Sequence, residues 1–291
     1  MYLSSTGGEA DRVDLEGWKR MDMGKRVDME KREELKKRGE MDERTDKGQI
    51  EENMGKMQNA RRAGGMGSTE NMVELRHVVK AYKKNVLFTD LNLAIPKGDI
   101  CGIVGPNGTG KSVLFKMICG LAQPDRGEIL IDGEALKKGM FPRNAGVILD
   151  SSGFLPDETG LKNLEILAGI RGKVKREKLA DLLWQVGLDP ELKVKVAKYS
   201  LGMKQRLAMA QALMEDPSLL ILDEPFESVD DKGVEHLRNM LKSMNEEQAV
   251  TILLTSHNSQ DILTLCRSIY RLQGKDLQRA EEVDLVWDCE M

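Results

Sequence analysis

The chain has 291 residues, of which 32% are charged and only 4% aromatic, and its formal net charge is −4 at pH 7. This length allows one large domain or two small ones, and the slightly negative charge gives no reason to expect a nucleic acid partner. No apolar run reaches the roughly 18–20 residues that cross a bilayer, and the polar N-terminus lacks the apolar stretch of a secretory signal. The cysteines form no Cys-x-x-Cys pair, and we expect them to be buried thiols in a reducing compartment: Cys101, Cys119, Cys266 and Cys289.

Residues 1–71 differ in composition from the rest of the chain. Charges of both signs alternate, methionine is frequent and large apolar residues are few, as in Lys31–Arg38. Such a segment cannot bury enough apolar surface to offset the conformational entropy lost on ordering, so we predict that it is disordered. A regulatory or docking arm is the alternative interpretation. The folded domain is expected to comprise residues 72–291.

The folded part is predicted to begin with two extended segments, Val73–Tyr82 and Asn85–Ile95, followed by a turn at Pro96–Asp99. The apolar run Ile100–Val104 then predicts a buried strand. A helical pattern follows at Val113–Cys119, and Gly120 is suited to its C-terminal cap.

A glycine-rich loop stands between this strand and this helix, and that context predicts a phosphate-binding loop. Glycines let the backbone fold around an anion, and the loop amides and the helix N-terminus direct partial positive charge at it. Lys111 would bridge terminal phosphate oxygens, and Ser112 would hold Mg²⁺. A ligand-free turn between a strand and a helix is the alternative. The predicted nucleotide-binding residues here are Gly105, Pro106, Asn107, Gly108, Thr109, Gly110, Lys111, Ser112 and Val113.

The remainder of the chain alternates strands with helices, which favours a mainly parallel α/β sheet with ligand groups beyond the carboxyl ends of its strands. We expect strands at residues 128–132, 144–149, 219–222 and 250–255, and closing edge strands at 268–273 and after Gly274. We expect helices from about Leu155 to Gly187, from Ser200 to before Pro217, around Val234–Met244 and at Ile262–Cys266.

Two carboxylates follow the apolar strand Leu219–Leu222 directly. Asp223 suits the shell of a Mg²⁺ ion, and Glu224 can point toward a terminal phosphate and act as general base for an attacking water. A helix N-cap after a strand is the alternative. His257 ends another strand of the same predicted sheet, and we therefore hypothesise that it contacts the γ-phosphate. The alternative is a core or surface residue, which a lone histidine more often is.

Taken together, the phosphate loop, Tyr199–Arg206, Leu219–Pro225, Ser228–Asp230 and His257 resemble the ATP-binding subunit of an ABC transporter, over about residues 72–280. The resemblance implies an α/β fold of the phosphate-loop NTPase type, with an antiparallel β subdomain and an inserted helical subdomain at about residues 151–215. It also implies a peripheral protein on the cytoplasmic face of the cell membrane that hydrolyses ATP with Mg²⁺ and energises a separate transmembrane permease, with an exporter as the expected type.

The resemblance assigns further residues to the site. Tyr82 would stack on the adenine ring, whereas a strand aromatic in the core is the alternative. Ser200 and Gly202 would contact the γ-phosphate of an ATP held by a second subunit, and Asp230 would lie at that interface. Two copies would thus enclose two ATP molecules head to tail.

Three positions depart from the usual pattern of the family. Asp150 stands where a glutamine is usual, and its carboxylate can still bind Mg²⁺ or water. Leu201 and Met203 replace a glycine and a glutamine of the signature motif, in a form similar to the bacitracin- and lantibiotic-exporter branch. The departures at Asp150 and Leu201 leave open a nucleotide-binding switch with weak hydrolysis. A soluble ABC protein that acts on ribosomes or DNA is a further alternative, although such chains usually carry two of these domains or a long coiled-coil insertion.

Overall fold

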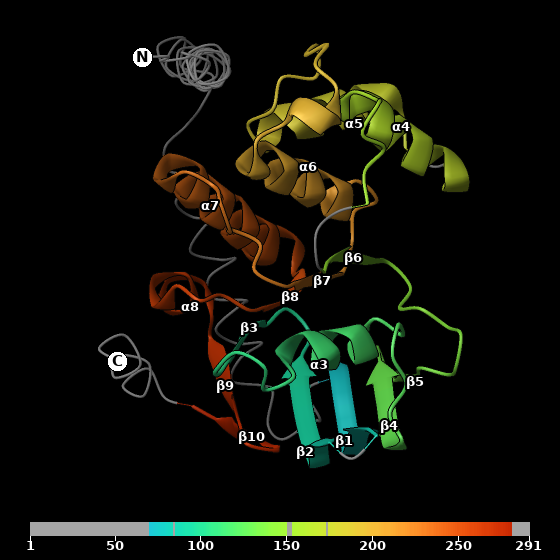
Figure 1. Cartoon of the computed structure of the whole chain (residues 1–291), viewed down its shortest axis with the longest axis vertical. Coiled ribbons are helices and arrows are strands. Elements are labelled where there is room, and N and C mark those ends of the chain that lie inside the picture. Colours follow the sequence, from blue (N-terminus) through green and yellow to red (C-terminus); the bar gives the residue numbers. More distant parts are fainter. Residues whose placement is uncertain (1–69, 84, 150–152, 173, 281–291) are drawn as a thin grey trace, which may run out of the picture. The chain divides into compact units, whose positions relative to one another are not determined.

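The computed structural model describes residues 70–83, 85–149, 153–172 and 174–280, and Figure 1 shows the arrangement of their elements. Most of the predicted disordered segment lies outside these residues, as do Asp150 and Cys289. Strand β1 begins at Asn71, one residue before the predicted start of the folded domain. None of the described helices is both long and apolar enough to cross a bilayer.

An antiparallel sheet is formed by the first part of the described chain, in the order β2-β1-β4-β5. The two extended segments predicted at its start form a hairpin of two long strands, and a short strand β5, which the sequence pattern did not predict, pairs with β4. The four strands are β1 (Asn71–Tyr82), β2 (Asn85–Pro96), β4 (Arg126–Ile131) and β5 (Glu134–Ala135).

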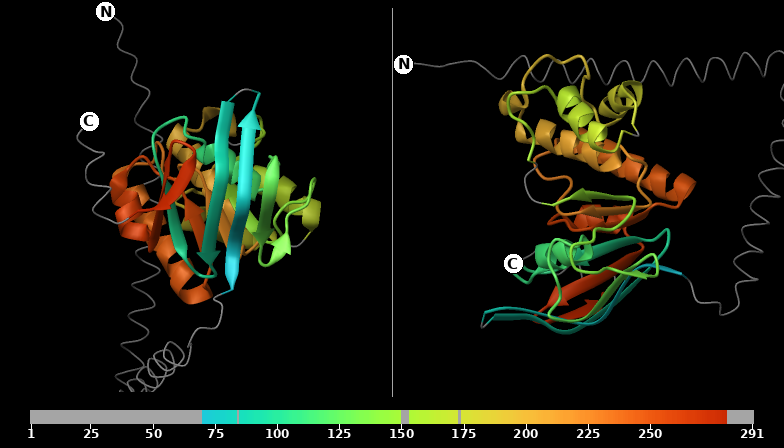
Figure 2. Two further views of the ribbon diagram at one scale, coloured as in Figure 1. Left: turned by 90° about the horizontal axis from the view of Figure 1, so that it is seen from below. Right: turned by 90° about the vertical axis from the view of Figure 1, so that its right-hand side faces the viewer.

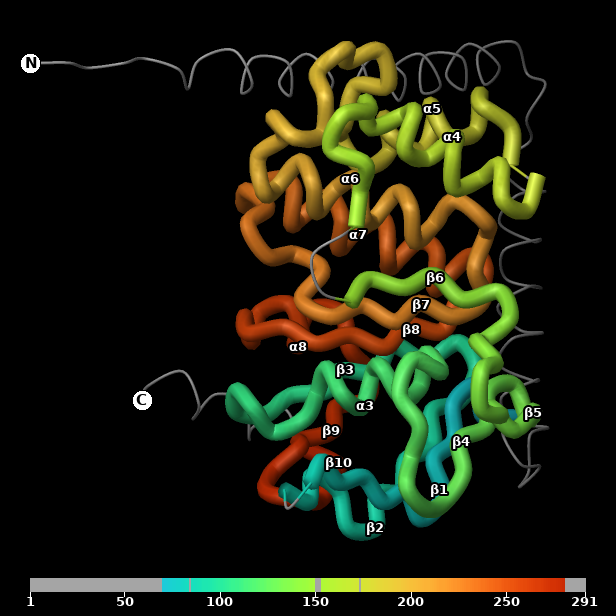
Figure 3. The backbone as a smooth tube through the Cα atoms, turned by 45° about the vertical axis from the view of Figure 1, so that its right-hand side comes forward, coloured from blue at the N-terminus to red at the C-terminus, as the bar shows by residue number. Residues whose placement is uncertain are grey.

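A second sheet has the order β10-β9-β3-β8-β7-β6, and the parallel course of β6, β7, β8 and β3 can be followed in Figure 3. All of its strands run parallel except β10, which pairs antiparallel with β9. The segment predicted as an edge strand, β9, is an internal strand between β3 and β10, so that part of the prediction was wrong. The strands are β3 (Ile100–Val104), β6 (Ala145–Ile148), β7 (Leu219–Leu222), β8 (Thr251–Leu254), β9 (Ser268–Gln273) and β10 (Asp276–Arg279).

The parallel sheet separates two apolar cores, because successive side chains of a strand point to opposite faces. In β7, Leu220 and Leu222 pack into one core, while Leu219 and Ile221 pack into the other. All four side chains are at most 1% exposed. Burial on both faces explains the unbroken apolar runs of these strands.

Helices cover both faces of the parallel sheet. Helix α3 (Lys111–Ile118) packs between the two sheets, with Phe115 and Met117 fully buried. Helices α7 (Asp231–Gln248) and α8 (Ser259–Leu265) share the opposite core with the remaining helices (Figure 2). Those remaining helices are α4 (Gly160–Arg171), α5 (Arg176–Gln185), the short 3₁₀ helix η1 (Val196–Lys198) and α6 (Leu201–Leu213).

Helix α4 begins later than the sequence pattern predicts. The hydroxyl of Thr159 caps its first turn by accepting a hydrogen bond from the amide of Lys162 (3.2 Å). Buried Asn163 exchanges hydrogen bonds with the backbone of Leu155, at 2.7 and 3.1 Å, and thereby holds the preceding residues as a loop. The predicted helical start at about Leu155 is therefore a loop, because side-chain capping fixes the true start.

Candidate nucleotide-binding site

The loop Gly105–Gly110 connects β3 to α3 and has the backbone of an anion cradle. Gly105 and Gly110 have φ angles of 147° and 108°. A Cβ on Gly105 would lie 2.3 Å from the carbonyl oxygen of Leu272, so only glycine fits there. No side chain caps the first turn of α3, whose amides are therefore available to a phosphate.

The Lys111 ammonium lies within this cradle. Its Nζ donates hydrogen bonds to the carbonyl oxygens of Gly105 (2.6 Å) and Pro106 (3.2 Å). Burial lowers the pKa of Lys111, and the negative charges of Glu224 and Asp223 oppose that effect. The arrangement places a partly desolvated cation next to two carboxylates, where phosphate oxygens could replace the two carbonyl partners.

Thr255 ties the two carboxylate residues to the end of the neighbouring strand. Its fully buried hydroxyl donates to Oδ1 of Asp223 (2.6 Å) and accepts from the amide of Glu224 (3.0 Å). Since β7 and β8 are adjacent parallel strands, their carboxyl ends bring these residues together. The carboxylate of Asp223 is thereby held at a fixed position at the edge of the sheet.

Glu224 is held by several contacts and has one free acceptor. Gln205 donates to its backbone carbonyl (3.1 Å), and the amide of His257 donates to Oε2 (3.0 Å). Oε1 is buried and accepts no hydrogen bond within the described chain, although Nε2 of His257 lies 3.4 Å away. Burial raises the pKa of Glu224, with the charge and amide of His257 acting in the opposite direction.

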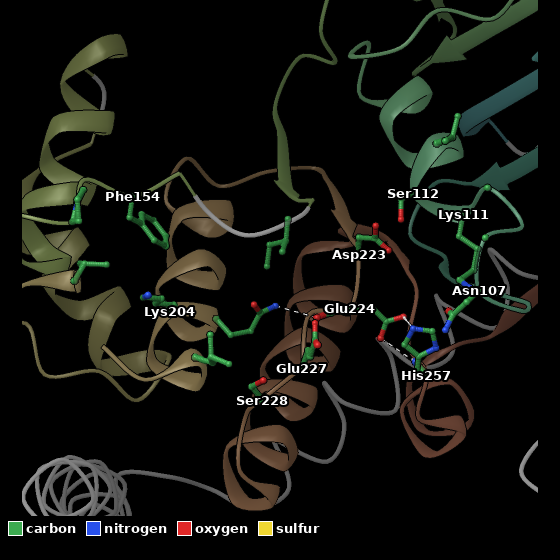
Figure 4. Close-up of a pocket in the computed structure, with 18 of the residues that line it drawn as sticks. Asn107, Lys111, Ser112, Phe154, Lys204, Asp223, Glu224, Glu227, Ser228 and His257 are labelled. Atoms are coloured by element: carbon green, nitrogen blue, oxygen red, sulfur yellow. Dashed lines mark hydrogen bonds and ion pairs between the residues drawn. The ribbon is translucent and has the colours of Figure 1, made fainter. Parts of the chain in front are cut away.

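A cavity of about 750 Å³ joins these groups, and Figure 4 shows its lining. The cradle residues Asn107, Lys111 and Ser112 lie on one side of it, and helix α6 contributes Lys204 and Gln205 from another. Val113 and His257 also line it. The structure thus brings most of the predicted residues of the phosphate loop to one cavity with both carboxylates and the histidine, while Gly105, Pro106 and Thr109 do not line it.

Ser112 and Asp223 both line the cavity and offer a hydroxyl and a carboxylate oxygen. Oxygen donors of this kind suit Mg²⁺, which retains waters and substrate phosphates as its other ligands. No group of three or more histidine, cysteine or acidic side chains in the described chain is arranged to hold a metal by itself. The donor set therefore fits a Mg²⁺ ion that binds together with phosphate.

The predicted signature residues lie at the exposed start of α6. The hydroxyl of Ser200 caps this helix by accepting from the amide of Met203 (3.2 Å). A Cβ on Gly202 would approach the carbonyl oxygen of Ser228 to 2.5 Å, which explains the glycine. Leu201 is 69% exposed. Asp230 caps α7 and forms an ion pair with the buried Arg206 of α6, so its carboxylate has a partner within the chain.

Tyr82 lies at the end of β1, where it pairs with Asn85 across the turn of the hairpin. It is 49% exposed and does not line the cavity, so the interpretation as a core aromatic was wrong. Asp150 lies outside the described residues. Cys101, Cys119 and Cys266 are free thiols, the first two buried as expected.

Sequence reasoning missed the second layer of contacts around the carboxylates. Thr255 and Gln205 position Glu224 and Asp223, and neither residue was singled out. A signal was present for Thr255, because a polar residue at the end of an apolar strand, two residues before His257, requires a partner when it is buried. Gln205 had no such signal, since its role depends on where α6 packs.

Comparison with known proteins relates this chain to ATP-binding proteins of ABC transporters. The sequence profile of the ABC transporter family matches residues 88–227. An ABC transporter ATP-binding protein of Bacillus subtilis, YybJ, is 37% identical over 73% of this chain and 97% of its own length. The bacitracin transport protein BcrA of Enterococcus faecalis is 37% identical over 66% of this chain and 63% of its own length, and the lantibiotic transport protein SrtF of Streptococcus pyogenes is 34% identical over 72% and 91%.

A solved structure shares the fold. The dimeric ATP-binding cassette MJ0796, bound to ADP and phosphate, has a TM-score of 0.67 and 26% identity over 72% of this chain and 99% of its own. Fold and site together define an ATP-binding cassette of the phosphate-loop type. The chain belongs to the family of ABC transporter ATP-binding proteins, which confirms the resemblance, the α/β fold and the ATPase class predicted from its sequence.

Proposed function

We propose that this site hydrolyses ATP with Mg²⁺ and that hydrolysis drives a transmembrane permease, of the exporter type, carried on a separate chain. The observation that carries the proposal is the buried Oε1 of Glu224, which accepts no hydrogen bond within the described chain and belongs to a residue that lines the same cavity as Lys111. A buried acceptor without a donor is costly unless a ligand or water completes it. An attacking water beside a γ-phosphate would do so.

Each residue then has a distinct task in phosphoryl transfer. The backbone N–H groups of residues 107–113 and the ammonium of Lys111 bind the phosphate chain, while Ser112 and Asp223 would hold Mg²⁺, which would neutralise phosphate charge. Glu224 orients the water and accepts its proton, because burial makes its carboxylate more basic. His257, held through Oε2 of Glu224, contacts the γ-phosphate. Asp150 is proposed as a further contact to Mg²⁺ or its water.

The nucleoside and the second subunit complete the proposed site. Tyr82 offers a half-exposed ring for adenine. Ser200 and Gly202, at the exposed N-terminal end of α6, would contact the γ-phosphate of ATP bound to a second copy. Asp230 would lie near that interface while it remains paired to Arg206. The dimeric state of the cassette MJ0796 supports the pairing of two copies.

The Glu224→Gln variant tests this mechanism. Gln keeps the size and polarity of the side chain but cannot accept the proton, so we expect the rate of ATP hydrolysis to fall by about 100-fold or more. In ATP and Mg²⁺ the variant should accumulate as a dimer on size-exclusion chromatography. Wild-type turnover by the variant would refute the role of Glu224.

A nucleotide-binding switch with weak hydrolysis is the second candidate, and the 69% exposure of Leu201 at a glycine position of the signature favours it. Wild-type turnover near background, with ATP-dependent dimers retained, would support the switch over the ATPase cycle. Leu201→Gly should then raise turnover.

The proposed location is the cytoplasmic face of the cell membrane, in complex with the permease. Detergent extraction of the tagged native protein followed by mass spectrometry tests this. A polytopic membrane protein in near-equal amount would support it, whereas recovery of ribosomal proteins alone would support the soluble alternative.

A further inference from the structure

Lys80 places its charged group against the ring of Tyr82. Its Nζ lies 4.9 Å from the centroid of the ring, although the residue as a whole is only 9% exposed. The ammonium donates to the carbonyl oxygen of Gln123 (2.7 Å) and to Oδ1 of Asp125 (3.2 Å). A lysine side chain held at its end in this way has lost most of its rotamer freedom.

Asp125 also fixes the backbone on which Tyr82 stands. Its Oδ2 accepts from the amide of Ala81 (2.7 Å), and its own amide donates to the carbonyl oxygen of Val79 (2.8 Å). The register between β1 and β2 shifts on both sides of Lys80, and such bulges redirect side chains. Asp125, in the turn before β4, therefore fixes the backbone of β1 at the bulge that precedes Tyr82 and influences the direction of its side chain.

This clamped end of the hairpin lies beside the phosphate loop. Leu87, near the start of β2, lines the cavity. The ring of its neighbour Phe88 lies 2.9 Å from where a Cβ on Gly110 would stand. Tyr82 pairs with Asn85, two residues before Leu87, so it stands on the same end of the hairpin as a residue that lines the cavity.

We propose that Lys80 is a positioning residue for nucleotide binding: its ammonium covers one face of the Tyr82 ring and holds the ring with its other face presented to the adenine. The inference rests on the proposed adenine contact of Tyr82. Attraction between an ammonium and an aromatic ring of this kind corresponds to about a two- to fivefold change in affinity. Lys80 thus acts on the base, through Tyr82, and does not touch the phosphates.

The test compares two ligands by calorimetry in the presence of Mg²⁺, ADP and inorganic pyrophosphate, of which only ADP carries a base and neither is hydrolysed by this ATPase. Lys80→Met should weaken the binding of ADP about two- to fivefold and leave the affinity for pyrophosphate unchanged. The matched control Lys80→Arg keeps a cation over the ring and should bind ADP as the wild type does. Should Lys80→Met fail to fold, Asp125→Asn removes the charged partner of the Lys80 ammonium. This variant should weaken ADP binding by a smaller factor and leave pyrophosphate binding unchanged.

Two further variants, Tyr82→Ala and Tyr82→Ala combined with Lys80→Met, separate the role of Lys80 from the adenine contact of Tyr82 on which it rests. Tyr82→Ala should weaken ADP selectively, and adding Lys80→Met to it should cause no further loss. If Tyr82→Ala weakens ADP but Lys80→Met does not, the role of Lys80 is refuted while the adenine contact stands. If Tyr82→Ala leaves ADP binding unchanged, the adenine contact itself fails. Equal weakening of ADP and pyrophosphate by Lys80→Met would refute positioning in favour of a general structural role.

Discussion

Glu224 has a backbone conformation that few residues of its type adopt, with φ at 49°. The left-handed region costs a non-glycine residue roughly 1–2 kcal/mol, and such strain persists where surrounding contacts impose it. Here the amide is fixed by Thr255 and the carbonyl by Gln205, from two different elements. The strain is thus the consequence of directing this carboxylate away from the strand and into the cavity.

The buried carboxylate of Glu224 should make the fold less stable at neutral pH. Its raised pKa means that the folded protein binds the proton more tightly than the unfolded chain does, so ionisation favours unfolding. Glu224→Gln, which carries no charge, should therefore melt at a higher temperature than the wild type at pH 7 to 8. The difference should shrink as the pH falls through the raised pKa. Differential scanning fluorimetry of the nucleotide-free proteins measures it, and a difference that stays constant with pH would contradict this explanation.

Two glycines of the cradle offer a matched pair of substitutions. Gly105→Ala places a methyl group against the backbone of β9, where nothing can yield without moving the strand. Gly108→Ala meets no atom within 4 Å and carries only the strain of a φ of 79°. We expect Gly108→Ala to cost about 1 kcal/mol of unfolding free energy and Gly105→Ala substantially more, with loss of ADP binding. Urea denaturation measures the unfolding free energy of both variants, and calorimetry measures their ADP binding. Equal effects of the two substitutions would show that the β9 contact is unimportant.

At the scale of residues, the sequence predicted what a contiguous motif specifies. The phosphate loop was recognisable because its glycines, Lys111 and Ser112 stand at fixed spacing between a strand and a helix. The partners of Glu224 were not recognisable, because Thr255 and Gln205 lie 31 and 19 residues away from it and meet it only through the packing of β8 and α6.

Helices α7 and α8 are joined by a buried ion pair. Arg238 of α7 donates to Asp261 of α8, whose side chain is 3% exposed, and the hydroxyl of Ser256 donates to the other carboxylate oxygen (2.5 Å). The amide of Asn258 in turn donates to that hydroxyl (3.1 Å). The loop that carries His257 is therefore anchored, through Ser256, to two helices.

Removal of one partner of this pair should be costly. Asp261→Ala leaves the guanidinium of Arg238, which is 16% exposed, without its carboxylate, and we expect a loss of about 3–5 kcal/mol in unfolding free energy. The control is Glu215→Ala, which breaks the more exposed ion pair to Arg171 and should cost at most about 1 kcal/mol. Urea titrations of the three proteins provide the comparison, and similar losses would contradict the assignment of Asp261 as an anchor.

At the scale of elements, whether a segment forms a strand or a helix was easier to predict than its place in the sheet or its first residue. The apolar runs of β3, β7 and β8 identified them as buried strands, since both of their faces are covered. Strand β9 has a mixed sequence with only two buried residues and was placed at an edge, because strand order depends on crossovers that no local pattern records. The start of α4 was placed early because Asn163 binds the backbone of a residue eight positions before it.

The whole domain is built so that one ligand site depends on both cores. Strand β3 and helix α3 frame the phosphate loop, and α3 packs into one core, while α6 reaches the cavity from the other core. A ligand that contacts both sides should stabilise the domain as a unit. The alternation of strands and helices predicted the parallel sheet, whereas the antiparallel subdomain and the helical insertion were predicted only through the resemblance to a family, since contacts between distant segments leave no periodic signal.

Nucleotide should raise the melting temperature through Lys111. At about 100 times the dissociation constant, ligand adds about 2.7 kcal/mol to stability, which corresponds to roughly 5–10 °C for a domain of this size. ADP with Mg²⁺ should produce this shift in the wild type and in Lys162→Ala, an exposed lysine of α4, but not in Lys111→Ala. A full shift in Lys111→Ala would exclude the phosphate loop as the binding site.

The order of strands around β3 also has a consequence for synthesis of the protein. Its two neighbours in the sheet, β8 and β9, are about 150 and 170 residues further along the chain. On the ribosome, β3 and the glycine loop that follows it emerge long before β8 and β9, and both hydrogen-bonding edges of β3 stay unpaired until those strands have been made. Strands left open in this way are prone to pair with other chains, and late pairing over such separations is slow. The nascent chain therefore cannot bind nucleotide at this loop until the last strands appear, and truncation before residue 268 should yield aggregation in place of a smaller working cassette.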